Sequence, residues 1–334
     1  MLLSNTANEQ TAVGAGTLLT NTSGENNTGC GTFALFTNST GGFNNAVGAN
    51  SLLFNVDGSG NNALGESALF SNIHASFNTA IGDTALFNND SSGLGIGVHN
   101  TAVGDRALFS NTDSFNNTAV GSLALMGNDS AAAATANNNT AVGSRALRDN
   151  INATSNTAVG SLTLQNNDNT GNGTAFANTA VGFQVLFTNT DGGFNTAIGY
   201  QALMNSTGTG NTVLGASAGS GVTTASNVIA IGSVGADVSN SCFIGNISGV
   251  AVTGDPVVVD GNGQLGVAPA GSPLSANELL KQQRVVQELK ATTERQAAVI
   301  ALQEGQIKAL TTGLQKVSAQ LETSKTAPRV VNNP

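Results

Sequence analysis

Residues 100–111 of this chain read NTAVGDRALFSN, and a phrase close to the first five of these residues returns about fourteen times along the sequence. Successive closing glycines lie 17 or 22 residues apart, with gaps of 16 and 13 only near the end, so the long coil is the short coil plus five residues. A period near 20 residues indicates a solenoid, in which each coil packs against its neighbours. The structural repeat glycines are Gly14, Gly31, Gly48, Gly65, Gly82, Gly104, Gly121, Gly143, Gly160, Gly182, Gly199, Gly215, Gly232 and Gly245.

The order of residues within one coil predicts two short strands. Residues 100–103 form the expected first strand, Gly104 permits a turn or a close backbone approach, and residues 107–109 form the expected second strand. Asn111 and the polar residues after it are turn formers. The sequence therefore predicts an all-β repeat solenoid, a parallel β-roll with two short strands in each 17- or 22-residue coil.

Both faces of the expected first strand carry small or apolar residues. Alternation places Ala102 and Gly104 on one side and Thr101 and Val103 on the other. One face fills the inside of the coil, and the other needs a cover that a second copy of the chain would supply most simply. A row of outward threonines is also a feature of ice-binding solenoids, but the same position accepts Ile229, which favours a buried role.

Repeated side chains predict ladders that run from coil to coil. Equivalent positions lie about 4.8 Å apart in a parallel stack. The expected amide ladder is Asn78, Asn100, Asn117, Asn139, Asn156, Asn178, Asn195 and Asn211, and the expected aromatic ladders are Phe36, Phe70, Phe87, Phe109 and Phe187, and Phe43, Phe77, Phe115 and Phe194. Cys30 and Cys242 occupy strand positions, where each is expected to act as a small apolar residue on a packed strand.

The additional residues of the long coils fall in the second turn of the coil. They form three candidate contact loops, whose ends are Ser91 and His99, Ser130 and Asn137, and Asn169 and Ala177. Loops on a rigid scaffold vary freely and often make binding contacts. All three are expected on one edge of the solenoid.

Composition argues against several classes of function. Residues 1–275 contain three basic and fifteen acidic side chains, a balance of −12, so no nucleic-acid partner is expected. His74 and His99 lie in loops without a cysteine or an acidic cluster at catalytic spacing, so we expect no enzyme activity, no metal and no cofactor. No apolar run approaches the roughly 20 residues that span a bilayer, so no direct membrane insertion is expected, and no signal peptide is visible.

The C-terminal quarter follows a different pattern. We expect a β-roll domain over residues 1–250, a Gly/Pro-containing connector over 251–275, a coiled coil over 276–325 and a disordered tail over 326–334. Heptad spacing predicts the coiled coil, with glutamines weakening its d positions. Its predicted core is Leu279, Val286, Leu289, Ile300, Ile307, Leu310, Leu314, Val317 and Leu321.

The phrases NVIAIG at residues 227–232 and NTAVG at residues 100–104 resemble the head repeats of the YadA-like trimeric autotransporter adhesins, in which Ser-Val-Ala-Ile-Gly recurs. The resemblance covers residues 10–250 and implies a left-handed parallel β-roll of three chains, followed by a neck and a trimeric coiled-coil stalk. The coil of this chain is longer than the family's. The chain is also similar to bacterial and phage tail-fibre-type proteins with Asn-Thr-Ala-Val-Gly repeats, although it shows no room for their C-terminal chaperone domain.

These observations predict a non-enzymatic homotrimer that mediates adhesion or receptor display through a rigid β-roll head on a coiled-coil stalk. Its expected partners are further copies of itself and a host-cell, matrix or glycan surface. Its expected location is extracellular, on a cell surface or a virion. The alternative is a structural or spacer fibre, similar to a phage tail fibre or a surface component, without a ligand of its own.

Overall fold

The computed structural model describes residues 7–245, 257–259, 265–267 and 276–324. The chain divides into two compact units, Met1–Gly249 and Val250–Pro334. The first unit is a parallel β-solenoid of about 14 turns, and the second contains one C-terminal helix. This confirms the predicted solenoid and the predicted change to helix after it.

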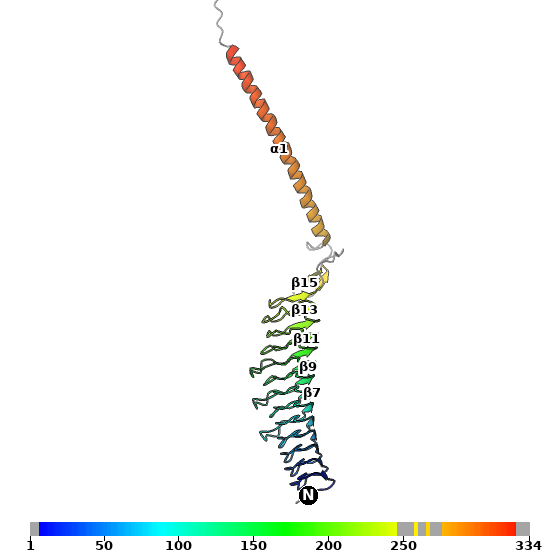
Figure 1. Ribbon diagram of the computed structural model, residues 1–334. Helices are drawn as coiled ribbons and strands as arrows, with labels where there is room; N and C mark the ends of the chain where they lie inside the picture. Colours follow the sequence, from blue (N-terminus) through cyan, green and yellow to red (C-terminus); the bar gives the residue numbers. More distant parts are fainter. Residues whose placement is uncertain (1–6, 246–256, 260–264, 268–275, 325–334) are drawn as a thin grey trace, which may run out of the picture. The chain divides into compact units, whose positions relative to one another are not determined.

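Each coil contributes one three-residue strand to a single parallel sheet, and the strands follow one another in chain order along one side of the coils (Figure 1). Neighbouring strands pair in register, with Thr101, Ala102 and Val103 opposite Thr118, Ala119 and Val120. The strands are β1 (Thr11–Val13), β2 (Thr28–Cys30), β3 (Asn45–Val47), β4 (Asn62–Leu64), β5 (Thr79–Ile81), β6 (Thr101–Val103), β7 (Thr118–Val120), β8 (Thr140–Val142), β9 (Thr157–Val159), β10 (Thr179–Val181), β11 (Thr196–Ile198), β12 (Thr212–Leu214), β13 (Ile229–Ile231) and β14 (Cys242–Ile244).

The predicted second strand of each coil is wrong. Residues 107–109 lie in a run of turns, because Arg106 and Leu108 both have positive φ, 52° each. The leucine four residues after the closing glycine has φ between 48° and 52° in eleven coils: Leu18, Leu35, Leu52, Leu69, Leu86, Leu108, Leu125, Leu147, Leu164, Leu186 and Leu203. A leucine is uncommon in this left-handed region. Each of these leucines is fully buried, so its packing offsets the strained backbone.

The core of the solenoid is narrow and made of small residues and these leucines. The central strand alanine, Ala102 in β6, is fully buried, and so are Ala107 and Leu108 of the same coil. Gly104 closes the strand with φ at +135°, and a Cβ there would lie 2.6 Å from the carbonyl carbon of Gly121 in the next coil. The repeat glycine therefore serves both roles expected of it, the turn and the close approach between coils.

The aromatic rows are shorter than predicted. Phe70, Phe87 and Phe109 do stack, with centroids 4.7 and 5.1 Å apart, but Met126 and Arg148 occupy the next two coils, so Phe187 is separated from the stack. The second predicted row is wrong, because its members do not stack on one another. Phe77 instead stacks on His99, with ring centroids 5.3 Å apart.

Both cysteines are exposed, which corrects the expectation that they are packed. Cys30 takes the third position of β2, and Cys242 takes the first position of β14. Both positions point away from the solenoid interior, since the central residue of a strand is the one that points inward.

The second unit contains a two-stranded antiparallel sheet and a helix. Strands β15 (Val257–Val259) and β16 (Leu265–Val267) pair within the segment predicted to be a connector without regular structure. Helix α1 (Ala276–Ser324) covers the predicted coiled-coil segment. The predicted tail, residues 326–334, lies outside the described residues.

Candidate functional site

A buried row of asparagines, each seven residues after a closing glycine, runs through short and long coils. It keeps the three long coils in register with the rest of the solenoid. We call this row the turn asparagines: Asn21, Asn38, Asn55, Asn72, Asn89, Asn111, Asn128, Asn150, Asn167 and Asn189, all fully buried. Asn111 donates through Nδ2 to Oδ1 of Asn89 at 3.0 Å and to the carbonyl oxygen of Ser114 at 2.7 Å. From the sequence we interpreted Asn111 as a turn former and did not predict this row, although the regular recurrence of asparagine marks it.

A second buried row confirms the predicted amide ladder at the start of the phrases. Oδ1 of Asn100 accepts the backbone N–H of Asn117 at 3.0 Å, and its Nδ2 donates to the carbonyl oxygen of Ser114 at 2.9 Å. Turn amides and phrase amides therefore meet on the same carbonyl groups. Buried polar groups are tolerated when they are hydrogen-bonded in this way.

The turn asparagines explain how a coil accommodates five additional residues. In a short coil, Asn72 donates to the carbonyl oxygen of Ala75, three residues ahead. In a long coil, Asn89 donates to the carbonyl oxygen of Gly97, eight residues ahead, at 2.8 Å. Asn128 and Asn167 make the same long bond, to Ala136 and Ala175. The row of turn asparagines therefore continues unchanged through the long coils, and the five additional residues protrude from the coil.

An aspartate directly after the turn asparagine anchors each insertion. Asp90 accepts the backbone N–H groups of His74 and Ala75 in the preceding coil through Oδ2, at 2.7 and 3.0 Å, and that of Gly95 in the loop through Oδ1, at 2.6 Å. Asp129 and Asp168 occupy the same position in the other long coils. The Asn-Asp pair in long coils, where short coils have Asn followed by Ser, Val, Ile or Thr, was the sequence signal for this anchor.

Burial is the main influence on the pKa of these three anchors. It raises the pKa of Asp90, Asp129 and Asp168, since removing a carboxylate from water disfavours the charged form. The backbone N–H donors act in the opposite direction without cancelling the effect of burial. Exposed Asp237 differs, because hydrogen bonds from Thr223, Ala225 and Thr224 lower its pKa.

The predicted ends of the contact loops differ in exposure. Ser91, Ser130 and Asn169 are exposed, whereas Asn137 and Ala177 are half-buried. His99 is exposed and lies against Phe77. The longer turns of the three long coils project on the side of the solenoid away from the strand arrows (Figure 1).

The tips of the loops carry different chemistry. The first exposes Leu94 and Ile96, the second is a run of alanines at residues 131–134, and the third exposes Asn172. The third loop also contacts the following coil, since the Thr170 hydroxyl donates to Asp191 at 2.9 Å. The loops therefore share an anchor and differ in the surface they present.

The outward face of the sheet carries an apolar row beside a row that is mostly threonine and asparagine. The third residue of each strand forms a row that we call the outer apolar row. Its exposed members include Val13, Val47, Leu64, Ile81, Val120, Val142, Val159, Ile198, Leu214, Ile231 and Ile244, with exposed fractions between 37% and 58%. Contiguous apolar surface of this kind marks an interaction site.

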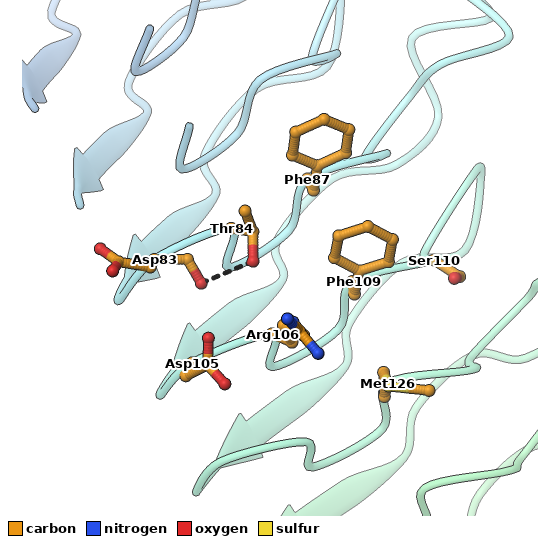
Figure 2. Close-up of a pocket in the computed structure, with 8 residues that line it drawn as sticks. All are labelled: Asp83, Thr84, Phe87, Asp105, Arg106, Phe109, Ser110 and Met126. Atoms are coloured by element: carbon orange, nitrogen blue, oxygen red, sulfur yellow. Dashed lines mark hydrogen bonds between the residues drawn. The ribbon is translucent and has the colours of Figure 1, made fainter. Parts of the chain in front are cut away.

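A shallow groove crosses the solenoid beside the phenylalanine stack. Figure 2 shows the rings of Phe87 and Phe109 above one another, with Arg106 and Asp105 beside them. The guanidinium group of Arg106 makes no hydrogen bond or ion pair with any residue that the structure describes, although its backbone N–H donates to the carbonyl oxygen of Asp83 at 3.1 Å. The lining residues are Asp83, Thr84, Phe87, Asp105, Arg106, Phe109, Ser110 and Met126. The groove combines apolar rings with charges of both signs.

The predicted coiled-coil core lies along α1. Its members with described side chains are all exposed, between 51% and 70%: Val286, Leu289, Ile300, Ile307, Leu310, Leu314, Val317 and Leu321. Leu279 lies within the helix, in the part whose side chains are not described. The coiled coil itself stays a prediction.

Comparisons of the chain with protein-family profiles, with curated proteins and with solved structures find no match. The class of this protein is therefore stated by its architecture, a parallel β-solenoid followed by a C-terminal helix. In the described ranges, no three His, Cys, Asp or Glu side chains gather closely enough to hold a metal ion. No helix in the described part of the chain has the length and apolarity to cross a membrane.

Proposed function

We propose that this chain forms a non-enzymatic homotrimer that acts as an extracellular surface or fibre protein and mediates adhesion or receptor display. The observation that carries the proposal is the outer apolar row, which follows the whole sheet. Fourteen strands at about 4.8 Å extend it over roughly 65 Å. A single chain leaves this row in water, and covering it stabilises an assembly by about 25 cal/mol for each Å² removed from water.

The exposed apolar line of α1 supports the same proposal. Leu310 and Leu314 are 68% and 70% exposed in the single chain. A helix that exposes leucines at heptad spacing is stabilised when it pairs with identical helices. Thus both units of the chain have surfaces that further copies would cover. The number three comes from the resemblance to the YadA-like heads.

The contact elements of the proposed adhesin are the three insertion loops. Each is held by a buried aspartate and by the long bond of a turn asparagine, so its tip is presented on a fixed base. A trimer would repeat each loop three times, and multivalent binding would amplify a weak contact.

The second candidate is a structural or spacer fibre without a ligand. The observation that favours it is the lack of shared chemistry among the loop tips, which are apolar, alanine-rich and polar in turn. A spacer requires only that the asparagine ladders continue along the solenoid.

The molar mass in solution tests the proposed assembly. Light scattering coupled to size exclusion should give about 100 kDa, three times the 33.2 kDa of one chain. A chain ending at Gly271 would show whether the solenoid trimerises without the helix. A mass of one chain for the full-length protein would contradict the trimer.

A further inference from the structure

A pair of stacked aromatic rings lies just beyond the strands β10 and β11. Phe183 and Tyr200 each follow a strand-closing glycine, and their ring centroids are 5.7 Å apart with planes 14° from parallel. Phe183 is 40% exposed and Tyr200 is 53% exposed. These rings are outside the strands, and so they do not belong to the outer apolar row.

Small residues flank this pair in the coils on either side. Ser161 and Ala216 occupy the equivalent positions, and backbone bonds keep the register, since Gln184 N–H donates to Ser161 and Ser217 N–H donates to Tyr200. A serine and an alanine are too small to cover an aromatic ring. The pair is therefore a short apolar platform with open ends, unlike the Phe87–Phe109 stack, which continues into Met126.

A glutamine directly follows each of the two rings in the sequence, Gln184 after Phe183 and Gln201 after Tyr200. Nε2 of Gln201 donates to Oε1 of Gln184 at 2.8 Å. This bond orients both amides and leaves Oε1 of Gln201 and Nε2 of Gln184 without a bond to any described residue. One acceptor and one donor thus remain free on the residues that follow the two exposed rings.

The platform is uncharged within an acidic solenoid. The two positions after the closing glycine are Ser161 and Leu162, Phe183 and Gln184, Tyr200 and Gln201, and Ala216 and Ser217 in these four coils. The first of these two positions is acidic four to six coils before Phe183, at Glu66, Asp83 and Asp105. A cationic partner would favour that acidic part, and an anionic partner would be repelled by the solenoid as a whole.

We propose that the Phe183–Tyr200 platform binds a neutral saccharide. A hexose ring has an apolar C–H face that packs on an aromatic ring, and equatorial hydroxyls that exchange hydrogen bonds with the two amides. Sites for small molecules combine apolar and aromatic walls with a few polar groups that fix orientation. The proposal names the ligand class of the proposed adhesin and rests on that function.

Tyr200 provides a direct readout, because the chain has one tyrosine and no tryptophan. The full-length protein is first tested on an array of neutral hexose oligosaccharides, with sulfated oligosaccharides as charged comparators. The best neutral binder is then titrated while the tyrosine fluorescence is followed. We expect neutral oligosaccharides to bind and to change the Tyr200 emission.

Variants assign the binding to the platform. Tyr200→Ala and Phe183→Ala should each weaken binding to the array at least about tenfold, and Gln201→Ala should weaken it less. Tyr200→Phe should keep most of the binding because the ring remains. Phe109→Ala is the matched control from the other aromatic stack and should bind normally.

The proposal is overturned if no neutral oligosaccharide binds, or if Tyr200→Ala and Phe183→Ala bind as well as the parent protein. It is also overturned if either variant alters the molar mass, because the platform would then be a contact between copies. The proposed trimer is judged separately by the mass. Tyr200-dependent binding by a single chain would support the saccharide site and contradict the trimer. A trimer whose binding does not depend on Tyr200 or Phe183 would support the trimer and contradict the saccharide site.

Discussion

Buried asparagine amides connect the coils of this solenoid at the scale of single residues. From Asn38 to Asn189, each turn asparagine bonds to the amide of the preceding coil and to a backbone carbonyl of its own coil, as Asn111 does to Asn89 and Ser114. An amide has donors and an acceptor in one planar group, so a single residue type propagates the row. Serine at position 206 ends it.

Replacing a turn asparagine should be costly. Asn111→Ala removes the bonds to Oδ1 of Asn89 and to the carbonyl oxygen of Ser114, and it removes one of the two acceptors of Nδ2 of Asn128. We expect a loss of about 1–3 kcal/mol in the free energy of unfolding for each buried group left unsatisfied. Urea unfolding followed by circular dichroism measures it. The control Asn172→Ala, at an exposed loop amide whose backbone is not in the left-handed region, should change stability little, and an equal loss in both variants would contradict the role of the row.

The anchor aspartates predict how stability depends on pH. Burial raises the pKa of Asp129 above the ordinary value of 3.8, so the folded chain binds this proton more tightly than the unfolded chain. The stabilising contribution of the protonated form is complete below pH 3.8 and is lost as pH rises through the folded pKa. Asp237 acts in the opposite sense, because its pKa is lowered, and its contribution is lost only at lower pH.

Urea unfolding of the parent protein and of Asp129→Asn at a series of pH values above 3.8 isolates this effect. The free energy of unfolding of the parent should fall more steeply with rising pH than that of the variant. The variant should also be less stable at neutral pH, since an amide nitrogen would face the N–H donors that Asp129 now accepts. Identical pH slopes would show that burial does not control this carboxyl.

At the scale of the coil, the strand at residues 101–103 was predictable, whereas the turns at residues 107–109 were not. Alternation in residues 101–103 gave the strand, its inward alanine and its outward valine. The run at residues 107–109 also suggested a strand, because leucine and phenylalanine rarely occur with positive φ. Packing of Leu108 in a core with room for few side chains outweighed that local preference. Only contacts between coils reveal this, and one coil read alone lacks them.

The three insertions can be recognised in the sequence, but the aspartates that anchor them were not predicted. The change in spacing from 17 to 22 residues marks an insertion wherever it occurs. The aspartate after Asn89 could have been noticed as a feature of long coils only, yet its role depends on N–H groups of the preceding coil, such as that of His74. Such a partner is distant in sequence and close only in the fold.

Removing one insertion should leave the solenoid intact. Deleting residues 129–133 brings Ala136 to three residues after Asn128, the separation of the short coils. We expect the melting temperature to change by only a few degrees, because the deletion removes the buried carboxylate together with the loop it holds. Thermal unfolding by circular dichroism measures it. Loss of folding would show that the insertion belongs to the core.

The same type of deletion separates the two candidate functions. An adhesin that uses the loops should lose binding to cells or matrix when residues 90–94, 129–133 and 168–172 are removed together, while its melting temperature is kept. A spacer fibre should show no binding to lose. Binding is measured on immobilised cells and matrix proteins, with each single deletion as a control.

At the scale of the whole molecule, the outer apolar row predicts the effect of a surface charge. Val120→Asp combined with Val142→Asp places two charges in a row whose exposed fractions there are 37% and 38%. The single chain should still fold, since both side chains point outward. The trimer should dissociate or weaken, because the charges would be buried between copies without partners. Light scattering measures the mass, and Arg106→Asp, outside the row, is the control.

The long bond of the turn asparagines has a consequence for engineering. A coil closes in the same way whether its amide reaches three residues ahead or eight, so the length and sequence of the protruding segment are separate from the stability of the scaffold. Foreign peptides could thus be grafted behind any Asn-Asp pair, at sites two coils or about 10 Å apart. The solenoid is therefore a scaffold that holds exchangeable loops at a fixed spacing.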